Sequence, residues 1–113
     1  MKSIVYLITS EGMGNTSGTE LKKKLIGKFL TLLQDSRPLP SAICLYTDGV
    51  KLACQGSPVI EPLKKLESLG VRIILCQTCL EFFGLESQVA VGIVGGMGDI
   101  ITCMTEADSV VTV

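Results

Sequence analysis

Residues 71–79 read Val-Arg-Ile-Ile-Leu-Cys-Gln-Thr-Cys. They combine a strand-like apolar run with the start of a helix-like segment, and this alternation recurs along the rest of the chain. The first part, 71–75, is an apolar, β-branched run that predicts a buried strand. The residues from Cys76 to about Phe83 predict a short helix that follows this strand directly. We therefore expect the sulfur of Cys76 to lie at an accessible junction between strand and helix, with Cys79 one helical turn further on.

The same alternation of apolar runs and amphipathic segments extends from here in both directions. Further strands are predicted at 3–9, 42–46 and 109–113, and further helices at 17–34, 58–69 and 99–105. A helical turn is expected at 50–54, and 89–94 is ambiguous because Gly92 weakens it as a strand. Such alternation predicts βαβ units. The predicted fold is α/β, a three-layer sandwich with a mostly parallel sheet of four to five strands flanked by helices, in one domain of residues 1–113.

Two helix starts carry residues that commonly cap helices. Asn15 or Ser17 is expected to cap the helix of residues 17–34. Ser57 is expected to cap the next helix, because Pro58 fits the first helical position and Glu61 has the spacing of a capping box.

The composition argues against several classes of protein. A net charge of −1 and a sequence pI near 5.3 argue against a surface for nucleic acid or anionic membranes. No apolar run reaches the roughly 18 residues that span a bilayer, and the apolar start is too short for a signal peptide, so we expect a cytoplasmic protein. A hydrophobic content of 47% and a mean hydropathy of +0.50 predict leftover apolar surface and hence a homo-oligomer.

The chain has no histidine, which leaves cysteine sulfur as its best candidate nucleophile. The first-turn amides of a helix favour a thiolate, so Cys76 is the predicted reactive residue. Cys79 can form a reversible disulfide with it, or either cysteine can instead be a small apolar core residue. The odd count of five cysteines predicts free thiols rather than a disulfide framework.

A zinc site at this motif is disfavoured, because one cysteine pair supplies only two of the four ligands that structural zinc needs. Cys44 is expected inside a strand and Cys103 inside a helix, so neither is placed to complete the set. We expect no metal and no cofactor.

Loops that follow other strands supply further candidates, because ligands collect at the carboxyl ends of parallel strands. Gly12, Gly14 and Asn15 follow the first strand; their G-x-G spacing is only a weak dinucleotide signal, but the loop can offer amides to an anion such as a persulfide. Asp48 ends the second strand and can orient a partner, although capping of the next turn is favoured. The glycine-rich segment 95–98 can join the same edge.

Four segments together resemble the DsrE/DsrF-like proteins, and most closely the YedF-like branch, described as sulfurtransferase-like selenium metabolism proteins. The segments are GMGN at 12–15, YTDGVKLA at 46–53, GSPVIEPLKKLE at 56–67 and CQTCLEFFGL at 76–85. The resemblance implies a compact α/β fold with a parallel sheet, assembly into homo- or hetero-oligomers, and relay of sulfur as a persulfide. Cys76 is the position that matches the persulfide-bearing thiol, ahead of Cys79. YedF-like proteins typically carry an N-terminal TusA-like domain, which this sequence does not show before its first strand.

We therefore expect a sulfur-relay protein. The Cys76 thiolate takes sulfane sulfur, or selenium, from a donor protein such as a TusA-like domain, and passes it from a Cys76 persulfide to an acceptor protein or small thiol. Two alternatives stay open. One is a C-x-x-C dithiol–disulfide oxidoreductase, and the other is a non-catalytic oligomeric binding or regulatory domain.

Overall fold

The computed structural model describes residues 3–113, so Met1 and Lys2, the first residues of the predicted domain, lie outside the described part. It is an α/β fold built on one five-stranded sheet whose strand pairs are all parallel. The sheet order is β4-β3-β2-β1-β5, and the strands are β1 Ile4–Ile8, β2 Ala42–Leu45, β3 Arg72–Cys76, β4 Ile93–Gly95 and β5 Ser109–Thr112. The predicted fold class is confirmed.

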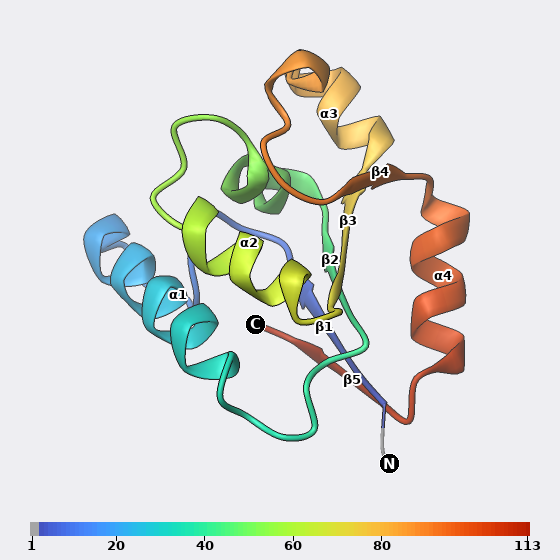
Figure 1. The fold of residues 1–113 in the computed structure, drawn as a ribbon. Coiled ribbons are helices and arrows are strands. Elements are labelled where there is room, and N and C mark those ends of the chain that lie inside the picture. The colour runs from blue at the N-terminus through green and yellow to red at the C-terminus, as the bar shows by residue number, and fades with distance from the viewer. Residues whose placement is uncertain (1–2) are drawn as a thin grey trace.

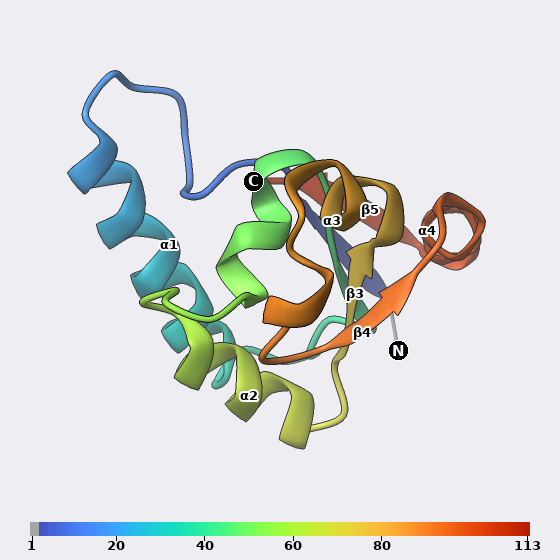
Figure 2. The same cartoon turned by 90° about the horizontal axis from the view of Figure 1, so that it is seen from above.

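Helices cover both faces of this sheet. They are α1 Thr19–Leu33, α2 Ile60–Ser68, α3 Gln77–Phe83 and α4 Met97–Glu106, together with the 3-10 helices η1 Thr47–Ala53 and η2 Glu86–Gln88. Figure 2 shows α1 and α2 on one side of the strands and α4 on the other. This division follows from right-handed crossovers: the chain moves from β1 to β3 in one direction across the sheet and returns from β4 to β5 in the other.

The core fills both faces of the sheet. All four side chains of the interior strand β2 are buried. On the α1 side, Tyr6 packs edge-on against Phe29, with ring centroids 5.2 Å apart. On the α4 side, Cys44 lies in register with Ile74, and Arg72 shares their face and donates a hydrogen bond to Cys103 of α4. Packing on both faces fixes the strand ends, and Figure 1 shows η1 and α3 following the ends of β2 and β3 at the same edge.

Both predicted helix caps are wrong. Helix α1 begins after Gly18, and the residue whose side chain accepts a nearby amide is Thr16, which bonds the Gly18 N–H. Helix α2 begins at Ile60, and Ser57 accepts the Val59 N–H within the turn that precedes the helix. In each case the polar side chain satisfies an amide of the local turn rather than one of the helix.

The ambiguous segment 89–94 contains the start of a real strand. Strand β4 pairs with β3 in parallel, with Ile74 beside Ile93 and Cys76 beside Gly95. Gly92 precedes it with φ of 87°, and a Cβ atom at this position would lie 2.8 Å from the carbonyl oxygen of Ile73. The glycine that weakened the sequence prediction is therefore what allows the chain to approach β3.

Within residues 3–113, no helix is both long enough and apolar enough to cross a membrane.

Candidate functional site

Cys76 occupies the predicted junction but is not accessible. It is the last residue of β3 and the residue before the first turn of α3. Only 1% of its surface is exposed. The reason is strand β4, whose residue Gly95 pairs with Cys76 and makes the end of β3 an interior position of the sheet. The expectation of an accessible sulfur at Cys76 is therefore wrong.

Cys79 is the partly exposed cysteine of the pair, and its sulfur has a main-chain donor. The backbone N–H of Thr47 donates a hydrogen bond to the Sγ atom of Cys79 over 3.1 Å. Thr47 begins η1 after strand β2, so a loop 32 residues away in sequence meets α3 at this point. A donor aimed at a sulfur atom stabilises negative charge on that sulfur.

Thr47 adopts a backbone conformation that a β-branched residue rarely takes. Its φ is 49°, in the left-handed region, and it is the one non-glycine residue with positive φ within residues 3–113. Its hydroxyl donates to the carbonyl oxygen of Thr9, 2.5 Å away, which ties this turn to the end of β1. Strain of this kind is typical of functional sites, where the surrounding structure holds it in place.

The electrostatics around Cys79 favour a protonated thiol at rest. Burial raises the pKa of Cys79, the Thr47 amide lowers it, and the nearby Cys76 thiol and Asp48 carboxylate raise it further. The net direction is upward from the ordinary value of a cysteine. The Thr47 amide thus offsets only part of the cost of burying a thiolate.

Asp48 follows Thr47 in η1 and forms an ion pair with Lys51. The Lys51 Nζ atom is 2.8 Å from the Asp48 carboxylate and 4.3 Å from the ring centroid of Phe83 on α3. The hydrogen bond to Asp48 raises the pKa of Lys51. Sequence reasoning identified Asp48 but missed Lys51 and Thr47. The spacing of three residues between Asp48 and Lys51 was an available signal for the pair.

Gly49 explains how η1 reaches this position. A Cβ atom at Gly49 would lie 2.1 Å from the carbonyl oxygen of Ile8, the last residue of β1. Only a residue without a side chain permits such a close approach. The absence of a side chain at Gly49 therefore allows η1, with Thr47 and Asp48, to lie against the carboxyl edge of the sheet.

The structure does not bring the remaining candidates to the sulfur atoms. Gly12 packs against Lys22 of α1, where its Cβ would lie 2.5 Å from the lysine Cβ, and the Met13 N–H bonds the Lys22 carbonyl. Gly14 and Asn15 are exposed, and Figure 2 shows their loop arching toward the start of α1, away from α3. Among residues 3–113, no three potential ligands cluster as a metal site would require.

The glycine-rich segment does reach the edge. Gly95 pairs with Cys76 in the sheet, and the Gly96 N–H donates to Asp99 over 2.9 Å to start α4. Segments 47–49, 76–79 and 95–96 thus meet at the carboxyl edge.

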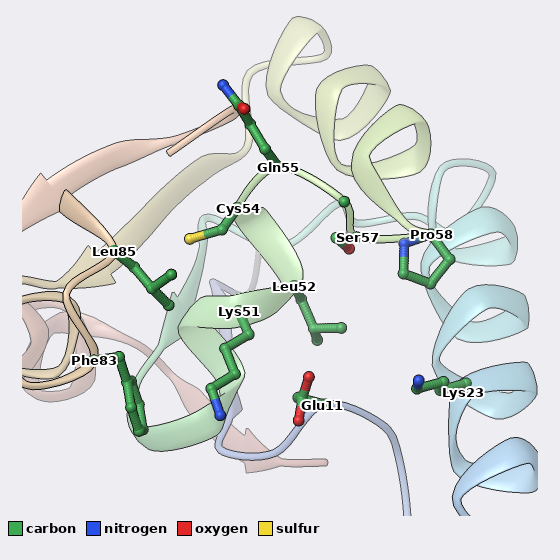
Figure 3. Close-up of a pocket in the computed structure, with 11 residues that line it drawn as sticks. Glu11, Lys23, Lys51, Leu52, Cys54, Gln55, Ser57, Pro58, Phe83 and Leu85 are labelled. Atoms are coloured by element: carbon green, nitrogen blue, oxygen red, sulfur yellow. The ribbon is translucent and has the colours of Figure 1, made fainter. Parts of the chain in front are cut away.

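A pocket opens beside this edge, between η1, α3 and α1. Its volume is about 420 Å³, and Figure 3 shows its charged side chains, Glu11, Lys23 and Lys51, with Phe83 on the α3 side. This size is within the range of small-ligand pockets.

Solved structures share the fold at low sequence identity. The ychN protein from E. coli matches with a TM-score of 0.74 at 19% identity, over 100% of both chains. MTH1491 from Methanobacterium thermoautotrophicum, a protein of unknown function, matches with a TM-score of 0.69 at 20% identity, also over 100% of both chains. BT1422 from Bacteroides thetaiotaomicron, of unknown function, matches with a TM-score of 0.66 at 18% identity, over 98% of this chain and 95% of that one.

A search of curated protein sequences finds no significant match. The DsrE/DsrF-like family model, in contrast, matches residues 2–113, nearly the whole sequence. The chain therefore belongs to the DsrE/DsrF-like family.

Proposed function

We propose that the protein relays sulfane sulfur on the Cys76–Cys79 pair, and that Cys79 is the thiol that receives it. The observation that carries the proposal is the Thr47 N–H on the Cys79 sulfur, 3.1 Å away, at a partly exposed position. The chain belongs to the DsrE/DsrF-like family, for which the sequence resemblance implies sulfur relay. The sequence resemblance favoured Cys76 as the carrier, but a sulfur that is 1% exposed is poorly placed to meet a donor.

The transfer needs no external oxidant. Cys79 loses its proton to solvent, and the thiolate attacks the outer sulfur of a donor persulfide. The donor's S–S bond breaks, its thiolate leaves and takes up a proton, and Cys79 carries the sulfur as a persulfide. The Thr47 amide stabilises the anion before and after the transfer. An acceptor thiolate then attacks the outer sulfur and restores Cys79.

Cys76 gives the persulfide a second outcome. Its thiolate can attack the sulfur bonded to the Cys79 side chain, which releases hydrosulfide and leaves a Cys76–Cys79 disulfide. Cys76 directly precedes α3 and Cys79 lies in its first turn, a spacing that supports the closeness that this step requires.

Persulfide loading of single variants tests the assignment. The protein is incubated with a sulfane-sulfur donor, and its intact mass is compared with those of Cys79→Ser, Cys76→Ser and Cys103→Ser. The parent, C76S and C103S should each gain sulfur, whereas C79S should gain at least tenfold less. Cys103 is a suitable control because it is buried on α4 and its sulfur accepts a hydrogen bond from Arg72. Equal labelling of C79S and the parent would refute the role of Cys79.

A dithiol–disulfide oxidoreductase is the second candidate, favoured by two cysteines one helical turn apart at the sheet edge. Catalysed insulin reduction that disappears in both C76S and C79S would select it. A relay with Cys79 as the carrier predicts that C76S keeps its sulfur load.

Partners and location extend the proposal. We infer a homo-oligomer, supported by four large apolar side chains exposed on β4 and α4, namely Ile93, Val94, Met97 and Ile101. Light scattering, which measures the mass of the protein in solution, tests the inferred homo-oligomer. The YedF-like branch, a selenium role, a TusA-like donor and a cytoplasmic location remain predictions from the sequence.

A further inference from the structure

The pocket of about 420 Å³ beside the carboxyl edge contains two amines and one carboxylate above an apolar wall. Lys51 and Lys23 supply the ammonium groups, Glu11 supplies the carboxylate, and Leu52 and Phe83 supply apolar surface. In Figure 3 the Glu11 carboxylate lies between the ends of the two lysines. The pocket therefore presents both signs of charge within a volume suited to one small molecule.

Lys51 is held in place before any ligand arrives. Its ammonium pairs with Asp48 at 2.8 Å and lies 4.3 Å from the Phe83 ring centroid. An ammonium group has three N–H donors, and Asp48 uses one of them. A positioned cation with donors to spare is suited to bind a carboxylate with little ordering cost.

The same elements that line the pocket also hold the Cys79 sulfur. Phe83 follows Cys79 by four residues on α3, a spacing that places two side chains on one helix face with Cβ atoms about 5–6 Å apart. Lys51 follows Thr47, the amide donor to Cys79, within η1. Cys79 does not itself line the pocket, so a ligand seated against Phe83 and Lys51 must extend about one helical turn along α3 to meet the sulfur.

We propose that this pocket binds a small zwitterionic thiol, an amino-acid or peptide thiol, as the carrier that exchanges sulfur with Cys79. The carboxylate of the ligand binds Lys51 and Lys23, its ammonium binds Glu11, its methylene groups contact Leu52 and Phe83, and its sulfur is directed toward α3. This inference rests on the proposed relay. Cys79 attacks the outer sulfur of the ligand's persulfide, the S–S bond breaks, and the ligand leaves as a thiol after protonation.

Binding is tested separately from sulfur transfer with ligands that cannot react. S-methylglutathione and S-methylcysteine are titrated into the full chain and followed by calorimetry and by NMR amide shifts. We expect at least one to bind and to shift the amides of η1 and α3. The two probes distinguish a peptide from a single amino acid as the ligand. The double variant Lys23→Gln, Lys51→Gln should bind at least tenfold more weakly.

The matched control is Lys64→Gln, Lys65→Gln, which makes the same charge change on the exposed surface of α2. It should bind like the parent. Equal binding by both double variants, or no binding of either probe to the parent, would overturn the pocket assignment.

Loading of Cys79 from two donors separates this inference from the proposed function. With glutathione persulfide, the Lys23, Lys51 variant should show a KM raised about tenfold, whereas its loading from inorganic polysulfide should stay within twofold of the parent. Probe binding without loading from either donor refutes the relay but keeps the pocket. Loading from polysulfide without probe binding keeps the relay and refutes the pocket.

Discussion

Two pairs of cysteines occupy this molecule, each formed by one residue of an interior strand and one of a helix. Cys76 and Cys79 lie at the carboxyl edge of the sheet, whereas Cys44 and Cys103 lie between β2 and α4. In the first pair, Cys79 is partly exposed and its sulfur accepts the Thr47 amide. In the second pair, Cys44 is 0% exposed and Cys103 4% exposed.

The electrostatics of the second pair oppose reactivity at Cys44. Burial, followed by the adjacent Cys103 thiol, raises the pKa of Cys44 to about 12, and the Arg72 guanidinium lowers it only in part. Arg72 instead donates to the Cys103 sulfur over 3.4 Å. The two cysteine pairs thus differ in the depth of the sulfur and in the donors that reach it, the two properties that set the pKa of a thiol.

The largest expected effect is on alkylation. At pH 7.5 in the folded protein, Cys44 should react with iodoacetamide at least a thousandfold more slowly than in denaturant, because a pKa of about 12 instead of 9.0 lowers its thiolate fraction by about three powers of ten. The alkylation rate of Cys79 should fall far less on folding, since part of its surface is exposed. Peptide mass spectrometry measures both rates. Similar rates at Cys44 and Cys79 in the folded state would contradict the comparison.

The pH dependence of Cys79 alkylation should span about two powers of ten. Only the thiolate reacts, and a pKa raised above the ordinary value keeps the thiolate fraction small at neutral pH. The rate should therefore rise about tenfold per unit from pH 7 to pH 9. Rates at six pH values, referenced to a free cysteine peptide, provide the measurement. A plateau that begins below pH 8 would show that the Thr47 amide outweighs burial.

Serine substitution should separate the two pairs by stability. Cys44→Ser places a hydroxyl in a fully buried site and should cost about 2 kcal/mol. Cys79→Ser leaves a partly exposed hydroxyl that can accept the Thr47 amide, and should cost less than about 1 kcal/mol. Urea unfolding compares the two variants. Equal costs would mean that the Cys79 site is as closed as the Cys44 site.

The smallest expected effect tests the backbone strain at Thr47, whose conformation directs its amide toward the Cys79 sulfur. Thr47→Gly should be more stable than Thr47→Ala by about 1 kcal/mol, because glycine adopts a φ of 49° without the penalty that alanine retains. Thr31 in α1 provides the opposite control, since in a helix Thr31→Ala should be more stable than Thr31→Gly by about 1 kcal/mol. Denaturant unfolding of the four variants checks the signs. The same sign at both positions would remove the argument from strain.

Most of the architecture could be predicted from the sequence because the long elements have clear periods. The runs that became β1, β2 and β3 are apolar and β-branched, and α1 and α2 repeat apolar residues at helical spacing. Strand β4 was harder, since it has three residues and three glycines beside or within it, Gly92, Gly95 and Gly96. It forms because β3 offers a partner, and a partner distant in sequence is not visible in a local pattern.

The candidate site could be predicted only in part, because a local pattern does not show contacts between segments that are distant in sequence. Local pattern identified the C-x-x-C motif and the strand-to-helix junction. It did not identify Thr47, whose left-handed conformation depends on the Thr9 carbonyl and the close approach of Gly49 to Ile8. Local pattern also predicted that the Gly12–Asn15 loop lies at the carboxyl edge. In the structure, contacts with Lys22 direct that loop toward α1 instead.

The amino-acid sequence by itself determined the order of strands and helices and the placement of Cys76 and Cys79 across the end of β3, because periodicity and propensity act over a few residues. Tertiary structure alone decided which of the two sulfurs meets solvent. Strand β4 covers the end of β3 and η1 brings an amide to α3, and both segments come from other parts of the chain. Exposure and hydrogen bonding depend on such neighbours, so the same motif on another sheet edge can expose the other cysteine.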